Sequence, residues 1–292
     1  MGMEMKILKR HFKQRSFGDI TGYNSGVSLM GPPPMTAWCY LADGVLIDTG
    51  TRHLRQPLLE SLESNRPDHV LITHHHEDHS GNASVIRERF NVPVYGHAIT
   101  AEKLRTSFKI KAYQHLVWGK SDPVIVEPFP DVIATKHLRF RPIHTPGHSK
   151  DHTAFLEETR GLLFSGDLFI GERIKFFRSD ECLEDQILSI GKVMALDFDS
   201  LFCAHRPIME KGKEALARKL DFLLNFYGTV KDLRTKGYES RAIIKKLDRK
   251  DDRTVKWITL NNACFAHMVT SAVRLAEKEM APAQDAIKPG CP

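Results

Sequence analysis

The sequence lacks both a paired cysteine framework and long apolar segments. Its five cysteines are scattered and never spaced as CxxC, which disfavours a disulfide scaffold or a zinc knuckle and favours free thiols in a reducing compartment. No apolar run reaches the roughly 18 residues that a membrane span needs, and no apolar segment follows the charged N-terminal stretch as in a secretory signal. We therefore expect a cytoplasmic protein with no membrane partner.

The rest of the composition is that of an ordinary globular protein. Of 292 residues, 41% are apolar and 27% are charged, which is enough to build a sizeable core. The net charge is +6 and the sequence pI is near 9.0. This excess would suit an anionic partner such as nucleic acid, but the basic residues are spread along the chain, with one denser zone at 241–256. We interpret the charge as a solvated surface.

Short apolar runs alternate with helical patches through the first two thirds of the chain, which indicates an α/β fold. Residues 38–48 predict two strands around the turn Asp43-Gly44. Further strands are predicted at 68–74, 92–97, 137–144, 153–158, 161–167 and 200–205, and helices at 54–65, 80–91, 98–108 and 183–196.

Strand signals nearly vanish after residue 209. We predict a catalytic region over 1–209, a helical C-terminal region over 210–280, with a winged-helix-like arrangement as one alternative, and a flexible tail over 281–292. The helices of this region carry apolar faces that must be buried. We expect them to form a wall of the substrate pocket or a homodimer contact, in preference to an independent nucleic-acid module.

Four histidines and two acids occupy the six positions from His74 to His79, directly after an apolar strand. Alternation along an extended chain places His74 and His76 on one side, and Asp78 and His79 then turn toward a neighbouring point. This arrangement suits two metal ions a few ångströms apart. By the same alternation, His75 is expected to point away from them.

Three more ligand-type residues each follow a predicted strand. His148 comes after the tight turn Pro146-Gly147, Asp167 ends the strand at 161–167, and His205 ends the strand at 200–205. Strand ends on one edge of a sheet are where an α/β fold places its site. A carboxylate such as Asp167 can bridge two cations.

Together these segments resemble the metallo-β-lactamase superfamily, in its glyoxalase II-like or lactonase-like branch. The segments that carry the resemblance are LIDTG (46–50), THHHEDHSGN (73–82), HTPGHS (144–149), FSGDLF (164–169) and AHRP (204–207). The resemblance implies an αββα sandwich with the metals at one edge. It also implies that His74, His76 and His148 bind the first metal, that Asp78, His79 and His205 bind the second, that Asp167 bridges them, and that Asp48 orients a ligand imidazole.

The chemistry implied is hydrolysis by a metal-bound hydroxide, with Asp78 as the catalytic residue that holds it in line. Zinc is the expected metal for two such sites, with iron or manganese as alternatives. We expect a small-molecule substrate with a thioester, lactone or similar ester. Neither specific activity follows, because the glycine-cysteine-glycine-arginine element of glyoxalase II relatives is absent and Ile170 stands where lactonases often have tyrosine. A metal-dependent endoribonuclease or phosphodiesterase is the main alternative, and an iron-dependent persulfide dioxygenase is a further one.

Specificity is expected in the loops 24–38 and 170–177. The apolar side chains proposed for the pocket are those of Met30, Met35, Trp38, Phe169, Phe176 and Phe177.

Overall fold

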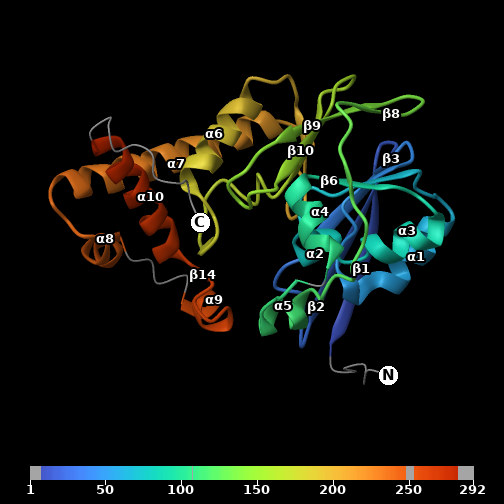
Figure 1. The fold of residues 1–292 in the computed structure, drawn as a ribbon, viewed down its shortest axis with the longest axis horizontal. Helices are drawn as coiled ribbons and strands as arrows, with labels where there is room; N and C mark the ends of the chain where they lie inside the picture. The colour runs from blue at the N-terminus through green and yellow to red at the C-terminus, as the bar shows by residue number, and fades with distance from the viewer. Residues whose placement is uncertain (1–7, 107, 248–252, 282–292) are drawn as a thin grey trace.

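A computed structural model describes residues 8–106, 108–247 and 253–281 (Figure 1). Its first β-sheet has seven strands in the order β1-β2-β3-β4-β5-β6-β7, antiparallel from β1 to β4 and parallel from β4 to β7. These strands are β1 (Lys9–Phe17), β2 (Ile20–Ser28), β3 (Ala37–Ala42), β4 (Val45–Ile47), β5 (His69–Leu71), β6 (Val94–Gly96) and β7 (Glu127–Pro128).

The second sheet has five strands in the order β13-β11-β10-β9-β8, and its β11–β13 pair is parallel. A separate two-stranded pair joins β12 to β14. These strands are β8 (Ile133–Ala134), β9 (Arg139–His144), β10 (Thr153–Glu157), β11 (Leu162–Gly166), β12 (Phe177–Arg178), β13 (Ser200–Cys203) and β14 (Ala263–Cys264).

Aromatic side chains fill the space between the two large sheets. The ring of Tyr40 on β3 lies 5.2 Å from that of Phe202 on β13, which in turn stacks on Phe164 of β11 at 4.7 Å. Helices cover the outer faces of both sheets. The helices are η1 (Arg52–Leu54), α1 (Arg55–Glu63), α2 (Glu77–Ser80), α3 (Ala83–Phe90), α4 (Ala98–Arg105), α5 (Ala112–Val117), α6 (Leu183–Met194), α7 (Gly212–Thr235), α8 (Ser240–Leu247), α9 (Arg253–Ile258) and α10 (Phe265–Met280).

Two further apolar clusters join each sheet to its helices. Side chains of α1, α3 and α4 pack on the first sheet, and side chains of α6, α7 and α10 pack on the second. The expected αββα sandwich is therefore confirmed.

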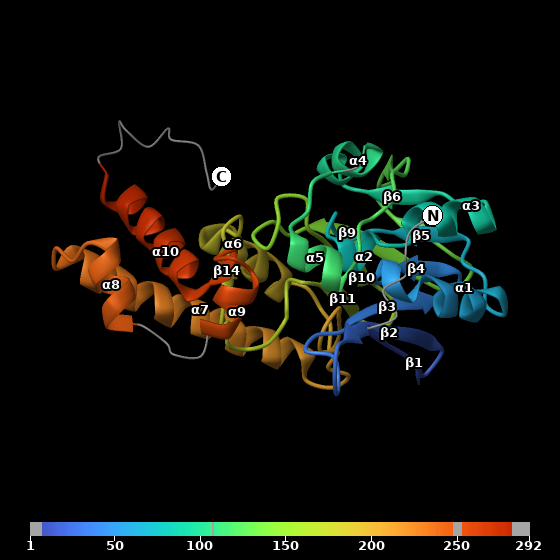
Figure 2. The ribbon, with the colours of Figure 1, turned by 90° about the horizontal axis from the view of Figure 1, so that it is seen from below.

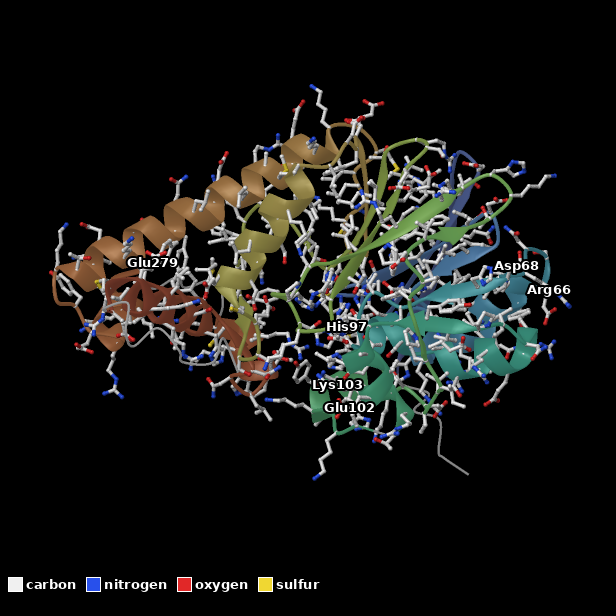
Figure 3. All side chains as sticks on the ribbon, turned by 45° about the horizontal axis from the view of Figure 1, so that its top comes forward. Arg66, Asp68, His97, Glu102, Lys103 and Glu279 are labelled. Atoms are coloured by element: carbon white, nitrogen blue, oxygen red, sulfur yellow. The ribbon has the colours of Figure 1, made fainter. Side chains whose placement is uncertain are left out.

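The C-terminal helices extend to one side of the sandwich and remain attached to it (Figures 1 and 2). Leu216, Leu223 and Phe226 of α7 share one buried cluster with Leu183 and Ile190 of α6. Farther out, Lys231 of α7 pairs with Glu279 of α10 at 2.7 Å (Figure 3). The region also supplies β14 to pair with β12. All of the expected tail except Ala281 lies outside the described residues.

Three features differ from the sequence-based expectations. Strands β1 and β2 were not predicted, because β1 is a mostly exposed edge strand whose charged side chains conceal its alternation. Consequently the predicted loop 24–38 is shorter, since β2 extends to Ser28 and β3 begins at Ala37. The expectation of free thiols is wrong for Cys182, which is disulfide-bonded, although Cys39, Cys203 and Cys264 are free.

None of the described helices is long and apolar enough to cross a membrane.

Candidate metal centre

The histidine-rich segment leaves the first sheet at the end of β5. Residue Thr73 anchors it, because the Thr73 N–H donates to Oδ1 of Asp48 at 2.8 Å and the Thr73 carbonyl accepts the N–H of Thr153 at 2.8 Å. Asp48 directly follows β4, and Thr153 begins β10 of the other sheet. The segment is therefore fixed between the two sheets at one edge of the sandwich.

Three imidazoles meet at one point. Nδ1 of His76 lies 2.8 Å from Nε2 of His74 and 3.1 Å from Nε2 of His148, and all three side chains are buried. His148 arrives from the turn after β9, where Gly147 has a φ of 134° and packs so closely on Gln186 of α6 that a Cβ there would meet the Gln186 N at 2.5 Å. The turn therefore requires glycine.

A second group lies beside the first. Oδ2 of Asp78 lies 3.7 Å from Nε2 of His79 and 3.6 Å from Nε2 of His205. The carboxylate of Asp167 lies between the two groups: its Oδ1 is 3.4 Å from Nε2 of His79 and 3.3 Å from Nε2 of His205, while its Oδ2 is 3.2 Å from Nε2 of His148. The structure thus brings all seven sequence-predicted ligands together.

The chemistry of these atoms fits divalent metal ions. Nε2 of His79 and Oδ1 of Asp167 are buried and have no hydrogen-bond partner among the described residues. Zinc bound to tetrahedral nitrogens at about 2.0–2.1 Å would set those nitrogens about 3.3 Å apart. The 2.8 and 3.1 Å separations around His76 are close to that value. Without a cation, the converging nitrogen lone pairs and the negative charge of the buried carboxylates would have too little positive charge nearby to offset the cost of their burial.

The protonation preferences of the ligands differ between the two groups. Burial, followed by the neighbouring cationic groups, lowers the pKa of His74 and His76 well below the ordinary value, which keeps both rings neutral as metal ligands must be. Burial also lowers the pKa of His205, but Asp167 and Asp78 outweigh it and raise that pKa to about 9. The second group therefore has an excess of negative charge, which attracts either protons or a cation.

Neighbouring side chains and carbonyls orient the outer nitrogens of these rings. Nδ1 of His79 donates to Oδ2 of Asp48 at 2.7 Å, and Nδ1 of His205 donates to the carbonyl of Thr36 at 2.7 Å. Such bonds fix the tautomer that leaves Nε2 directed at the metal. Asp48 therefore has the position that the sequence resemblance implied for it.

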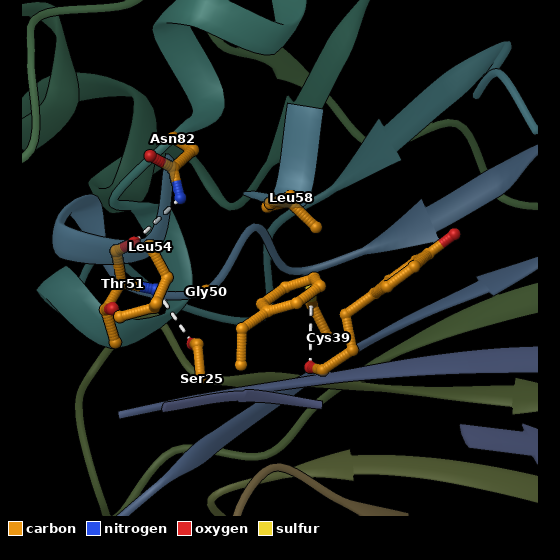
Figure 4. A pocket seen from close by; sticks show the side chains of 9 residues that line it. Ser25, Cys39, Gly50, Thr51, Leu54, Leu58 and Asn82 are labelled. Carbon is orange, nitrogen blue, oxygen red and sulfur yellow. Dashed lines mark hydrogen bonds between the residues drawn. The ribbon is translucent and has the colours of Figure 1, made fainter. Parts of the chain in front are cut away.

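Hydrogen bonds hold the loop after β4 against the end of the histidine-rich segment, and Figure 4 shows part of this scaffold. The Asn82 side chain, at the end of the histidine-rich segment, donates to the carbonyls of Thr49 and Thr51 at 2.7 and 2.9 Å. The Thr51 N–H in turn contacts Oγ of Ser25 on β2 at 3.4 Å. This scaffold fixes the loop after β4 with respect to the histidines.

His75 points away from the two groups. Its Nδ1 bonds to Asp151 at 3.0 Å, and its Nε2 accepts a bond from Lys103 of α4 at 3.0 Å (Figure 3). His152 is also no part of either group, since its Nε2 accepts the N–H of Asp167 at 2.9 Å and so helps to place that carboxylate. The role of Asp151 was missed in the sequence, where its place three residues after His148 was the available signal.

The C-terminal region reaches the surroundings of the metal ligands (Figures 1 and 2). Asn262 donates to the hydroxyl of Tyr113 on α5 at 2.8 Å and accepts from the hydroxyl of Ser179 at 3.2 Å. The next residue of α5, Gln114, donates to the carboxylate of Glu77 at 3.0 Å, between the ligands of the two groups. All three contacts connect segments that the sequence gave no reason to pair.

The six apolar side chains expected to line a pocket differ in burial: Met35, Trp38 and Phe176 are half-buried, and Trp38 packs against the aromatic cluster between the two sheets. Phe169 and Phe177 are buried in the core between the second sheet and its helices, so that prediction is wrong for both. Met30 is 85% exposed on the loop after β2, whose other end is tied to His205 through Thr36.

This combination of sandwich and ligand groups is matched by a known family, because the sequence profile of the metallo-beta-lactamase superfamily covers residues 33–221. The chain belongs to this superfamily. It is therefore a metal-dependent hydrolase, and its histidine and aspartate groups correspond to a metal site.

Two curated relatives and one solved structure define the similarity. The hydroxyacylglutathione hydrolase of Photorhabdus laumondii is 36% identical over 167 residues, which cover 56% of this chain and only 58% of that relative. The hydroxyacylglutathione hydrolase of Salmonella paratyphi B is 30% identical over 213 residues, which cover 70% of this chain and 75% of the relative. The structure of TTHA1623 in a di-iron-bound form is 25% identical, with a TM-score of 0.52 over 64% of this chain and 96% of that one.

Proposed function

We propose that this superfamily member is a binuclear hydrolase of small acyl thioesters. His74, His76 and His148 would hold one divalent ion, and Asp78, His79 and His205 would hold the other. Zinc is the expected metal because the ligands are imidazoles and carboxylates without a thiolate, and iron or manganese suit the same set. The di-iron form of TTHA1623 supports two metals in this fold.

The position of Asp167 is the observation that carries the proposal. One of its oxygens faces His79 and His205 and the other faces His148, at 3.2 to 3.4 Å. A carboxylate placed in this way can contribute one oxygen to each of two cations. Two ions so bridged would supply Lewis acidity that lowers the pKa of water to about 7 and polarises the acyl oxygen.

The protein's own groups would orient the reactants. The Asp78 side chain is buried at the centre of the second group and would accept a hydrogen bond from the attacking water, which aligns that water with the acyl carbon. The ring of Trp118 lies 6.5 Å from that of His205, and this buried indole would limit solvent on that side of the site.

The substrate class rests on the relatives. Both curated relatives are named hydroxyacylglutathione hydrolase, and that substrate is a thioester. The proposal does not extend to glutathione thioesters, because residues 170–173 read Ile-Gly-Glu-Arg where glyoxalase II relatives often have a glycine-cysteine-glycine-arginine element. A cytoplasmic location and a homodimer stay predictions from the sequence.

The test is a substrate panel on zinc-loaded protein, with Asp167→Asn as the matched inactive control. Acyl thioesters, lactones, a phosphodiester and single-stranded RNA would be compared by kcat/KM at pH 7. We expect thioesters to be hydrolysed best and the variant to lose at least a hundredfold. Preferential cleavage of RNA or the phosphodiester would contradict the proposal in favour of the endoribonuclease alternative.

A further inference from the structure

Lys219 is a buried lysine in the middle of α7. Its side chain is 3% exposed, and its Nζ donates to the carbonyl of Leu168 at 2.6 Å. Leu168 directly follows the bridging carboxylate Asp167. A charged group from the C-terminal helices therefore contacts the loop that presents the central residue of the metal centre.

The position of Lys219 on its helix is one that an apolar residue would normally occupy. Leu216, Leu223, Phe226 and Val230 are the neighbouring buried residues of the same face. Burying an ammonium costs several kcal/mol unless its surroundings compensate. Burial lowers the pKa of Lys219 to about 8, although nearby acidic groups, Glu181, Cys203 and Asp167, oppose that effect.

The chain around Asp167, at the end of β11 and just after it, is held at three backbone carbonyls. The carbonyl of Gly166 accepts the N–H of Ala204 at 3.2 Å, that of Leu168 accepts Lys219, and that of Phe169 accepts the thiol of Cys203. Two of these donors belong to the segment that leads to His205. The third, Lys219, is the one that comes from the C-terminal region.

We infer that Lys219 is a positioning residue for the metal centre, which holds the loop of Asp167 so that each carboxylate oxygen faces a different ligand group. The inference rests on the proposed binuclear site. The C-terminal helical region then completes the metal centre itself, in addition to any part that it has in the substrate pocket.

Replacing Lys219 by methionine separates this role from a structural one. Methionine has a similar length and fills the same apolar face, so the gain from removing the buried charge should offset the loss from the unpaired Leu168 carbonyl and leave the stability of the folded state nearly unchanged. Loss of the hydrogen bond should instead free the Leu168 carbonyl and loosen the Asp167 loop. Partners that orient metal ligands contribute 10- to 100-fold to metal affinity.

Lys213 provides a matched control. It lies on the same helix and donates to a backbone carbonyl, that of Leu196 at 2.5 Å, but Leu196 lies after α6 and carries no metal ligand. Lys213→Met therefore removes the same kind of bond from the same helix without contacting the Asp167 loop.

The experiment measures zinc affinity by competition with a chromophoric chelator, the absorption spectrum of the cobalt-loaded protein, and the thermal midpoint of the metal-free protein. For Lys219→Met we expect affinity for at least one ion to fall at least tenfold with an altered cobalt spectrum, while the thermal midpoint does not fall. Lys213→Met should retain wild-type affinity and spectrum.

Three outcomes would overturn the inference. Lys219→Met could bind both ions within twofold of wild type, both lysine variants could lose affinity equally, or the affinity of Lys219→Met could fall only together with its thermal midpoint. If Lys219→Met does not fold, Lys219→Leu, which also removes the donor and suits the apolar face of α7, would be compared with Lys213→Leu by the same criteria. Failure of the wild-type protein to bind two ions would instead reject the proposed function.

Discussion

Oδ2 of Asp48 lies 2.7 Å from Nδ1 of His79. Both side chains are buried, and the same carboxylate also accepts the N–H and the hydroxyl of Thr73. Because Nδ1 of His79 donates to Asp48, Nε2 is the nitrogen directed at Asp78 and Asp167, where it can bind a metal ion. One carboxylate at the end of β4 thus sets both the tautomer of a ligand and the path of the segment that carries it.

Removing this carboxylate should weaken metal binding. Asp48→Asn keeps the shape of the side chain but removes the negative charge that accepts the hydrogen bond from His79. Zinc affinity should therefore fall 10- to 100-fold in the chelator assay. Asp43→Asn is the control, because Asp43 bonds to the N–H of His137 near the other end of β4 and contacts no ligand. Equal losses from both variants would contradict the orienting role of Asp48.

The two adjacent histidines of the cluster should behave differently. His76→Ala removes a ring whose Nδ1 faces His74 and His148, so it should lose about one metal equivalent and at least a hundredfold in kcat/KM. His75→Ala removes only the bonds to Asp151 and Lys103, so it should keep both ions. Comparable metal loss in the two proteins, by elemental analysis, would mean that the ligand assignment is wrong.

Asn262 should couple the C-terminal region to the substrate pocket. Asn262→Ala removes the hydrogen bonds with Tyr113 and Ser179 and leaves the hydroxyl groups of those two residues without this partner. The free energy of unfolding should therefore fall by about 1–3 kcal/mol. If this contact forms a pocket wall, KM for the best thioester should rise while metal content is unchanged. Urea unfolding and steady-state kinetics measure both quantities. An unaltered KM would show that the C-terminal region only packs against the site.

Glu157 should make stability depend on pH. Burial raises its pKa, but hydrogen bonds from Thr159 and from the N–H groups of Thr159 and Arg160 outweigh this and lower it below the ordinary value of 4.5. A lowered folded-state pKa stabilises the fold above the unfolded value, and that contribution is lost as the pH falls through the folded one. Glu157→Gln should therefore destabilise by about 1–3 kcal/mol at pH 7 and progressively less below pH 4.5. A difference independent of pH would contradict this.

Much of the site could be predicted because its ligands follow strand ends in short, patterned segments. His74, His76 and His148 were recognisable from spacing and turn chemistry, and resemblance to one family supplied their grouping. The hairpin at Asp43-Gly44 formed as its turn residues indicate, with positive φ at both. These features are local, so the sequence contains them directly.

The parts that were missed depend on contacts between distant segments. Lys219 interrupts an apolar stripe between Leu216 and Leu223, which is a recognisable signal, but its partner Leu168 is far away in the chain. Asn262, which directly precedes β14, likewise contacts Tyr113 of α5, far away in the chain. Neither propensity nor periodicity identifies such partners.

The central claim is that one chain holds two divalent ions bridged by Asp167. The most direct test is elemental analysis of protein purified without chelator and of the same protein reconstituted with zinc, manganese or iron, beside Asp167→Asn. We predict about two equivalents for the wild-type chain and a clear loss for the variant. A wild-type value of one or less after every reconstitution, or an unchanged value in Asp167→Asn, would contradict the account.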